Sequence, residues 1–187
     1  MSLKEQVTLA VKESITEALT TIVSVMPVIK DSENMLELKD DGNVAVSLGI
    51  AGKLEGTIFI LFSQESAAKI ISKILGCDPK ELTSDSLEGV GEVLNIIAGG
   101  IKTRLEPAGY DFVLSIPSFV RTSDGLSIGS MAKMESLRLF VSCADCSFEF
   151  LMFYQVKSDT GKTAYERFKE QKSEAEEELR KFFEKKG

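Results

Sequence analysis

The sequence predicts an α+β domain in which two degenerate repeats, each a long helix followed by strands, form one sheet packed against the helices. Apolar residues recur at helical spacing in two long stretches, near the N-terminus and again between Ser84 and Pro107. Each stretch is followed by short apolar or alternating runs of the kind that form strands. Because this order occurs twice, we infer an internal duplication. The length of 187 residues fits one domain of ordinary size.

The first repeat is expected to begin with an amphipathic helix over residues 3–26, which Pro27 ends. A second helix is expected to run from Ser63 to Gly76 after the strands of this repeat. The strands, separated by Asp-Gly and Ala-Gly turns, are predicted over 35–38, 44–51 and 54–62. The apolar stripe predicted for the first helix is Leu3, Val7, Val11, Ile15, Leu19, Ile22 and Met26.

The second repeat begins with the other long helix, for which Thr83, Ser84 and Asp85 offer N-caps. Pro107 and Gly109 are expected to end it. Four strands are predicted after it, over 111–115, 119–122, 132–142 and 147–156. Two of these contain the apolar runs 137–141 and 148–153. Because an edge strand this apolar should be covered or paired, these runs make a homodimer physically plausible.

The second long helix carries polar residues that packing does not explain. One apolar stripe accounts for its core face: Leu87, Val90, Leu94, Ile97, Ile101 and Leu105. Glu92 and Asn95 fall outside that stripe, and both are expected to be exposed as neighbours on one face. The same face carries Glu88, Gly91, Gly99 and Lys102, and each helical glycine costs about 1 kcal/mol relative to alanine. This pattern favours a surface on which a partner docks, with ordinary solvated residues as the alternative interpretation.

The motif on this helix resembles that of a known family. Gly91-Glu92-Val93-Leu94-Asn95, with Gly99 following, is similar to the Glu-x-x-Asn-x-x-x-Gly signature of the CheC/CheX/FliY chemotaxis phosphatases. The resemblance covers most of residues 45–154 and departs at Glu88, where Ser or Asp is common, and at Ile96, where Met is common. The first helix offers Glu13-x-x-Thr16 and Glu17-x-x-Thr20 but no second Glu-x-x-Asn, which resembles CheX more than CheC.

The resemblance implies a CheC-like fold and a phosphatase that acts on the aspartyl phosphate of a CheY-type response-regulator receiver. In that case Asn95 would orient the attacking water and Glu92 would pair with the receiver's lysine, with Glu88, Gly91, Gly99 and Lys102 in the docking surface. The chain would need no cofactor of its own, because the receiver supplies Mg²⁺. The resemblance also implies a homodimer. The alternative is a non-catalytic receiver-binding or scaffold module of the chemotaxis or flagellar-switch machinery.

Composition excludes several other functions. With 22 Lys and Arg against 29 Asp and Glu, the net charge is −7, and no basic stripe is present to attract nucleic acid. Histidine is absent, which removes the commonest general base and metal ligand. No apolar run approaches the ~20 residues of a membrane span, and Lys4 and Glu5 lie where a secretory signal would be apolar. We therefore expect a cytoplasmic protein with no nucleic-acid or membrane partner.

Two short motifs and the C-terminal segment have simpler interpretations than a further active site. Gly161-Lys162-Thr163 lacks the first glycine of a P-loop. Cys143 and Cys146 have the spacing of a redox or metal motif, but the chain has no second cysteine pair and no histidine to complete a metal site. A two-residue hairpin with cross-strand cysteines is the simpler interpretation. The expected domains are a phosphatase domain over 1–157 and a charged amphipathic helix over 158–187. Docking on the domain is the first interpretation of this helix, and a dimer contact the second.

Overall fold

The computed structural model describes residues 1–24, 26–32, 44–76, 84–121, 134–143 and 146–157. The chain divides into two units, Met1–Lys157 and Ser158–Gly187. The second unit, with the charged helix predicted there, lies outside the described residues. The same is true of the Gly161-Lys162-Thr163 motif.

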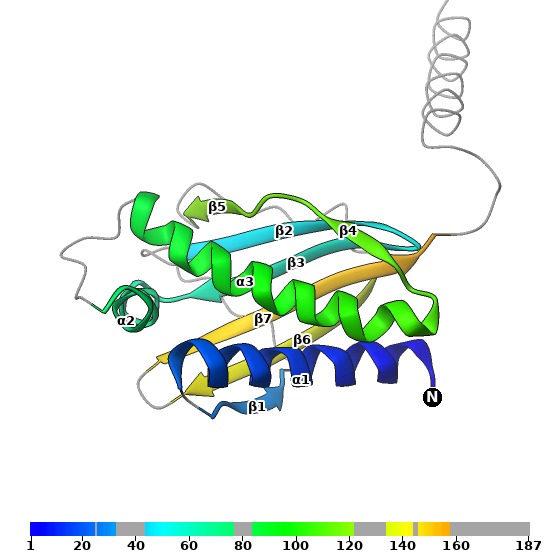
Figure 1. Cartoon of the computed structure of the whole chain (residues 1–187), viewed down its shortest axis with the longest axis horizontal. Helices are drawn as coiled ribbons and strands as arrows, with labels where there is room; N and C mark the ends of the chain where they lie inside the picture. Colours follow the sequence, from blue (N-terminus) through cyan, green and yellow to red (C-terminus); the bar gives the residue numbers. More distant parts are fainter. Residues whose placement is uncertain (25, 33–43, 77–83, 122–133, 144–145, 158–187) are drawn as a thin grey trace, which may run out of the picture. The chain divides into compact units, whose positions relative to one another are not determined.

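The described strands form one seven-stranded antiparallel sheet in the order β1-β6-β7-β3-β2-β4, and β5 also pairs with β2. The helices lie over one face of this sheet (Figure 1). The strands are β1 (Val28–Asp31), β2 (Val44–Gly52), β3 (Leu54–Phe62), β4 (Phe112–Leu114), β5 (Ser118–Arg121), β6 (Glu135–Cys143) and β7 (Cys146–Val156). The helices are α1 (Leu3–Val23), α2 (Gln64–Leu75), α3 (Ser84–Leu105) and the 3₁₀ turn η1 (Glu106–Ala108).

The sheet confirms the predicted α+β class and two-repeat organisation. Its central pair, β3 and β7, runs antiparallel in register from Leu54 opposite Val156 to Phe62 opposite Phe148. On one side β2 pairs with β3, followed by β4 and β5, and on the other side β6 pairs with β7, followed by β1. The halves α1-β1-β2-β3 and α3-β4-β5-β6-β7 therefore occupy equivalent places, and α2 is inserted between them.

The core lies between the sheet and the helices, and α1 packs against α3. Every residue of the stripe predicted for α3, from Leu87 to Leu105, is buried. In α1, the four central stripe residues are fully buried: Val7, Val11, Ile15 and Leu19. Burial of each such side chain contributes about 1.5–3 kcal/mol, so this face fixes how α3 is rotated about its axis.

The chain between α1 and β2 differs from the prediction. Helix α1 ends at Val23, with Ser24 in the left-handed conformation at φ 52°, so Met26 leaves the stripe and is 72% exposed. Strand β1 follows, although the sequence predicted no strand there. Its four mostly exposed residues carry no alternating pattern, and its partner β6 lies far away in the sequence. The strand predicted over 35–38 lies outside the described residues.

The remaining elements match their predictions within a few residues. Helix α2 is capped by Ser63, whose side chain accepts the Ser66 N–H, and ends at Gly76 in the left-handed conformation. The expected hairpin at the cysteines is also present, with Cys143 opposite Cys146. The structure joins these two buried cysteines in a disulfide.

The apolar runs 137–141 and 148–153 are not open sheet edges. Strand β7 is paired on both sides, with β3 and with β6. Strand β6 pairs with β1 along Leu139–Ser142. The edge-strand argument for a homodimer was therefore wrong, because these runs are already paired within the chain.

Candidate active-site helix

Helix α3 crosses the sheet with α1 along one side and the β4–β5 segment along the other (Figure 1). On each side a glycine of α3 lies against the neighbouring element. A Cβ on Gly100 would lie 2.9 Å from the Ser14 Oγ of α1. A Cβ on Gly91 would lie 2.8 Å from the Phe119 Cζ and 3.4 Å from the Pro117 Cβ. Helix α3 is thus packed against α1 on one side and against the β4–β5 segment on the other. The face between these two contacts, called the open face below, is not covered by either element.

Glu92 and Asn95 lie on this open face. The Glu92 side chain is exposed, whereas Asn95 is half-buried, which corrects the prediction that both are exposed. Asn95 follows Gly91 by one helical turn, which places it on the β5 side. Within the described part of the chain, neither side chain has a hydrogen-bond or ion-pair partner. Their polar groups are therefore available to a ligand or partner.

The two glycines near this pair differ in their surroundings. Gly99 lies on the open face, and a Cβ there would meet nothing within 4 Å. Gly91 is instead buried against the Phe119 ring. Gly91 is therefore not exposed, because a side chain of the same protein fills the space beside it, and its predicted place in a partner-binding surface stays a prediction. Gly91 lies at the edge of the site, toward β5.

Glu88 and Lys102 complete the predicted docking set. Glu88 is exposed one turn before Glu92, and Lys102 is half-buried. Neither side chain has an ion-pair partner among the described residues. The open face of α3 therefore presents two unpaired carboxylates near the carboxamide of Asn95.

The equivalent helix α1 offers no such pair. Its Glu13 and Glu17 accept hydrogen bonds from the Arg104 Nε at 3.1 Å and from the Arg104 Nη2 at 2.6 Å. The hydrogen bond with Glu17 is the main reason why the pKa of Arg104 is raised above its ordinary value. The Thr16 hydroxyl donates to the Lys12 carbonyl. The two Glu-x-x-Thr sequences of α1 are thus engaged within the protein, and of the two long helices only α3 leaves a polar pair free.

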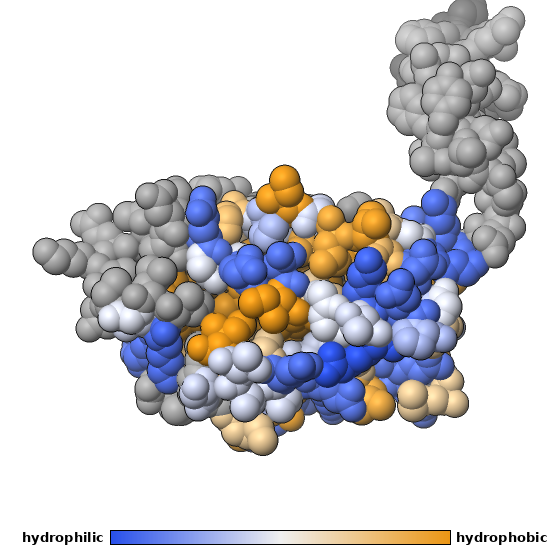
Figure 2. All heavy atoms as spheres, viewed as in Figure 1, coloured by the Kyte–Doolittle hydropathy of each residue, from blue (hydrophilic) through white to orange (hydrophobic). Residues whose placement is uncertain are grey.

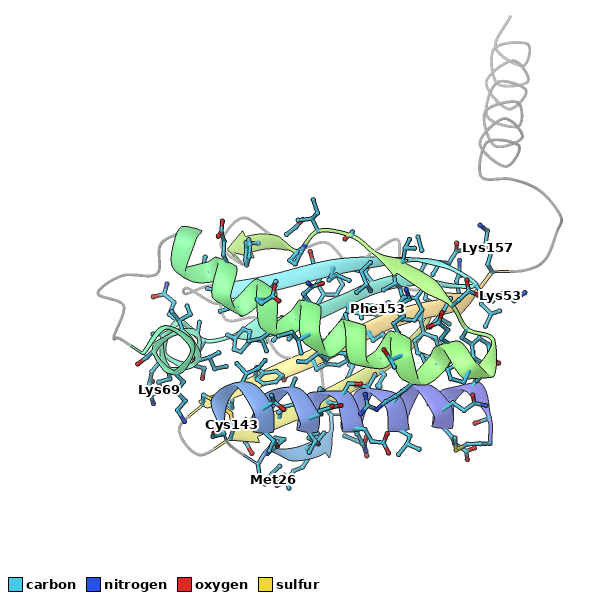
Figure 3. The ribbon with its side chains drawn as sticks, viewed as in Figure 1. Met26, Lys53, Lys69, Cys143, Phe153 and Lys157 are labelled. Atoms are coloured by element: carbon cyan, nitrogen blue, oxygen red, sulfur yellow. A yellow bond between two sulfur atoms is a disulfide. The ribbon has the colours of Figure 1, made fainter. Side chains whose placement is uncertain are left out.

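The described part of the molecule has hollows whose borders do not include Glu92 or Asn95. One of about 550 Å³ is bordered by Met26, Lys69 and Cys143, which lie together near one end of the sheet (Figure 3). None of the predicted site residues lines it. An exposed helix face with accessible polar groups suits contact with a partner, whereas enclosing a small molecule takes a concave site.

The described residues include no group of three or more His, Cys, Asp and Glu side chains that could hold a metal ion. None of the described helices is long and apolar enough to cross a membrane.

Sequence reasoning gave Phe119 no part in this site. It lies in β5 opposite Val46 of β2, and its ring reaches α3 at Gly91. A glycine inside a helix signals a close neighbour, but the sequence does not say which residue that neighbour is.

Comparisons with known proteins identify relatives of this chain. The model of the family "Chemotaxis phosphatase CheX" matches residues 44–141. The CheY-P phosphatase CheX of Thermotoga maritima is 25% identical over 146 residues, which cover 78% of this chain and 92% of that protein.

Solved structures share the fold. A CheC-like superfamily protein from Shewanella sp. PV-4 has a TM-score of 0.66 at 20% identity, covering 83% of this chain and 99% of its own. CheX from Borrelia burgdorferi, solved as a CheX-CheY-BeF₃-Mg²⁺ complex, has a TM-score of 0.65 at 22% identity. The match covers 79% of this chain and 97% of that chain. These structures confirm the predicted CheC-like fold. Because the family model spans more than half of the sequence, the chain belongs to the chemotaxis phosphatase CheX family.

Proposed function

We propose that this protein hydrolyses the aspartyl phosphate of a CheY-type response-regulator receiver, using the open face of α3. Family membership supports a phosphatase, and one relative is named a CheY-P phosphatase while another was solved in complex with CheY. The observation that carries the proposal is the pair Glu92 and Asn95, which is accessible and has no partner among the described residues.

The reaction suits the groups that this pair provides. Water attacks the phosphorus, the bond from phosphorus to the aspartate oxygen breaks, and the receiver regains a free carboxylate with release of inorganic phosphate. Such a transfer depends mainly on positioning and on charge stabilisation. The Asn95 carboxamide can both accept and donate hydrogen bonds, so it can hold water in line with the phosphorus. No histidine or nucleophile is needed from this chain.

Glu92 has a different part in this proposal. Its exposed carboxylate lies three residues from Asn95 on the same face, where it can pair with the receiver's lysine and anchor α3 in the receiver's active site. The receiver, rather than this chain, supplies the Mg²⁺ that neutralises charge on the phosphoryl group. Glu88, Gly99 and Lys102 lie near enough to take part in the same contact.

A scaffold that binds the receiver without hydrolysing its phosphate would use the same face. The two functions separate when a small amount of this protein is added to a large excess of phosphorylated receiver. An enzyme releases many phosphates per molecule, whereas a scaffold releases none above the receiver's own rate. We expect turnover. If phosphate is released no faster than from the receiver alone, only the scaffold function is left.

We also propose that the protein is a homodimer. The family resemblance implies this state, and Val28 and Phe140 leave an exposed apolar area at the β1–β6 side of the sheet. Multi-angle light scattering at micromolar concentration should give twice the chain mass. A mass of one chain, with residues 158–187 present, would contradict the proposal.

Removal of residues 158–187 tests the expected domain division. Because unit Met1–Lys157 contains the described sheet, helices α1, α2 and α3 and the whole α3 face, we expect the truncated protein to fold and to keep most of its activity. A loss of about 1–3 kcal/mol in unfolding free energy is expected if apolar side chains of the segment are buried. Circular dichroism during thermal unfolding and the turnover assay measure both quantities. A folded truncated protein without activity would show that the segment contacts the receiver.

A further inference from the structure

Large apolar side chains are exposed on both sides of the Glu92–Asn95 pair. Ile96 on α3 is 43% exposed and Phe119 on β5 is 37% exposed. In the view that shows this side of the molecule, hydrophobic atoms flank the hydrophilic atoms over α3 (Figure 2). Single exposed apolar residues are common on protein surfaces, so their position relative to the pair decides whether they have a function.

Helical geometry places these two side chains on opposite sides of the pair. Gly91 and Asn95 are one turn apart, and the Phe119 ring contacts α3 at Gly91, so Phe119 lies on the Asn95 side. Ile96 and Gly100 are also one turn apart, and Gly100 faces Ser14 of α1, so Ile96 lies on the side toward α1. Glu92 lies between the two flanks.

Phe119 is held in place before any partner arrives. Strand β5 pairs with β2 from Ser118 opposite Ser47 to Arg121 opposite Val44, which fixes the backbone at Phe119. The missing side chain of Gly91 leaves room for the ring to pack on the helix, and Pro117 contacts the same position. A fixed aromatic side chain loses little conformational entropy on binding, which is why such residues are frequent anchors of interfaces.

The reaction requires close contact at this place. For the Asn95 carboxamide to orient water at a phosphorus atom, α3 must come within a few ångströms of the receiver's phosphorylation site. Side chains that flank Asn95 and Glu92 are then pressed against the rim of that site. Unpaired carboxylates at Glu88 and Glu92 favour a partner that presents a cation at this place, as the receiver's lysine would.

We propose that Phe119 and Ile96 are the apolar anchors of the receiver-docking surface, and that Gly91 is a positioning residue that keeps Phe119 in place. The proposal rests on the proposed function, because it assigns the receiver as the occupant. In it, Glu92 and Asn95 act on the phosphorylation site, while Phe119 and Ile96 supply affinity by burying apolar area on the surrounding rim.

The test is steady-state hydrolysis of a phosphorylated receiver by the full-length variants Phe119→Ala and Ile96→Ser. We expect each substitution to raise KM by about tenfold or more while kcat stays within about twofold of the unmodified protein, as for loss of an anchor side chain. The dissociation constant for the receiver carrying beryllofluoride, a stable substitute for its phosphoryl group, should rise by the same factor.

Matched controls come from the same chain. Val113→Ala shortens an apolar residue that is 65% exposed on β4, and Leu9→Ser changes an apolar residue that is 48% exposed on α1, both away from the pair. Neither should change KM. Phe119→Leu keeps an apolar side chain and should recover most of the affinity, which separates lost contact from a disturbed fold if Phe119→Ala unfolds.

Several outcomes would overturn the inference. Unchanged KM and dissociation constants for Phe119→Leu, Phe119→Ala and Ile96→Ser would show that the receiver does not touch this surface. A fall in kcat alone would assign Phe119 a structural effect on α3. Weakened self-association with unchanged receiver affinity would make the surface a contact between copies. If the unmodified protein hydrolyses no phosphate but binds receiver through Phe119, the proposed function fails and the docking surface stands; if it does not bind, both fail.

Discussion

Replacing Asn95 by alanine should lower the rate of receiver dephosphorylation by about two orders of magnitude or more, the scale typical of losing one positioned transition-state contact. The substitution removes the group that holds the attacking water but leaves Glu92, Phe119 and Ile96 in place. Receiver binding should therefore survive. Single-turnover decay of phosphorylated receiver and the dissociation constant for beryllofluoride-loaded receiver measure the two effects separately.

The Asn95→Ala result needs a stability control and a matched variant. Asn95 is half-buried and has no partner among the described residues, so its loss should change the unfolding free energy by no more than about 0.5 kcal/mol. Thr16→Ala makes a comparable polar truncation in α1, three residues after Glu13, and should leave hydrolysis unchanged. Hydrolysis by Asn95→Ala at the rate of the unmodified protein would remove Asn95 from the catalytic assignment.

Charge reversal at Glu92 is expected to have the second large effect. In Glu92→Lys an ammonium group faces the receiver's lysine, so binding itself should weaken by about tenfold or more and activity should fall with it. The neutral Glu92→Gln should weaken binding less, because it loses the attraction without adding repulsion. Titration of the receiver at two salt concentrations checks the cause, since screening reduces an electrostatic penalty.

A second charge reversal separates the local effect from the change in net charge. Glu106 is exposed in η1 beyond the end of α3, and Glu106→Lys changes the net charge by the same amount. It should bind the receiver as the unmodified protein does. Equal affinities for Glu92→Lys and Glu106→Lys would mean that Glu92 makes no specific contact.

Much of the fold could be predicted because its signals are local. The stripe from Leu87 to Leu105 repeats at helical spacing, and each of its residues is buried as expected. The N-cap Ser63 and the left-handed Gly76 also delimit α2 where their residue types predict. Strand β1 was missed because its four residues acquire strand structure by pairing with β6, and no local pattern reports that pairing.

In the candidate site, too, the local features could be predicted from the sequence and the contacts between distant elements could not. The pair Glu92 and Asn95 could be identified within one helix, since their spacing alone puts them on a shared face. The contact between Gly91 and Phe119 joins α3 to β5 and depends on how both lie against β2, which the sequence does not encode locally. For the same reason, the engagement of Glu13 and Glu17 by Arg104 emerged only from the packing of α1 against α3.

The central claim is that this chain removes phosphate from a receiver, and the decay of phosphorylated receivers from the same genome tests it most directly. Each receiver is phosphorylated, and loss of its aspartyl phosphate is followed with and without a small amount of this protein. We predict that at least one CheY-type receiver loses its phosphate much faster with the unmodified protein and at its own rate with Asn95→Ala. Decay of every receiver at its own rate in the presence of the unmodified protein would contradict the claim.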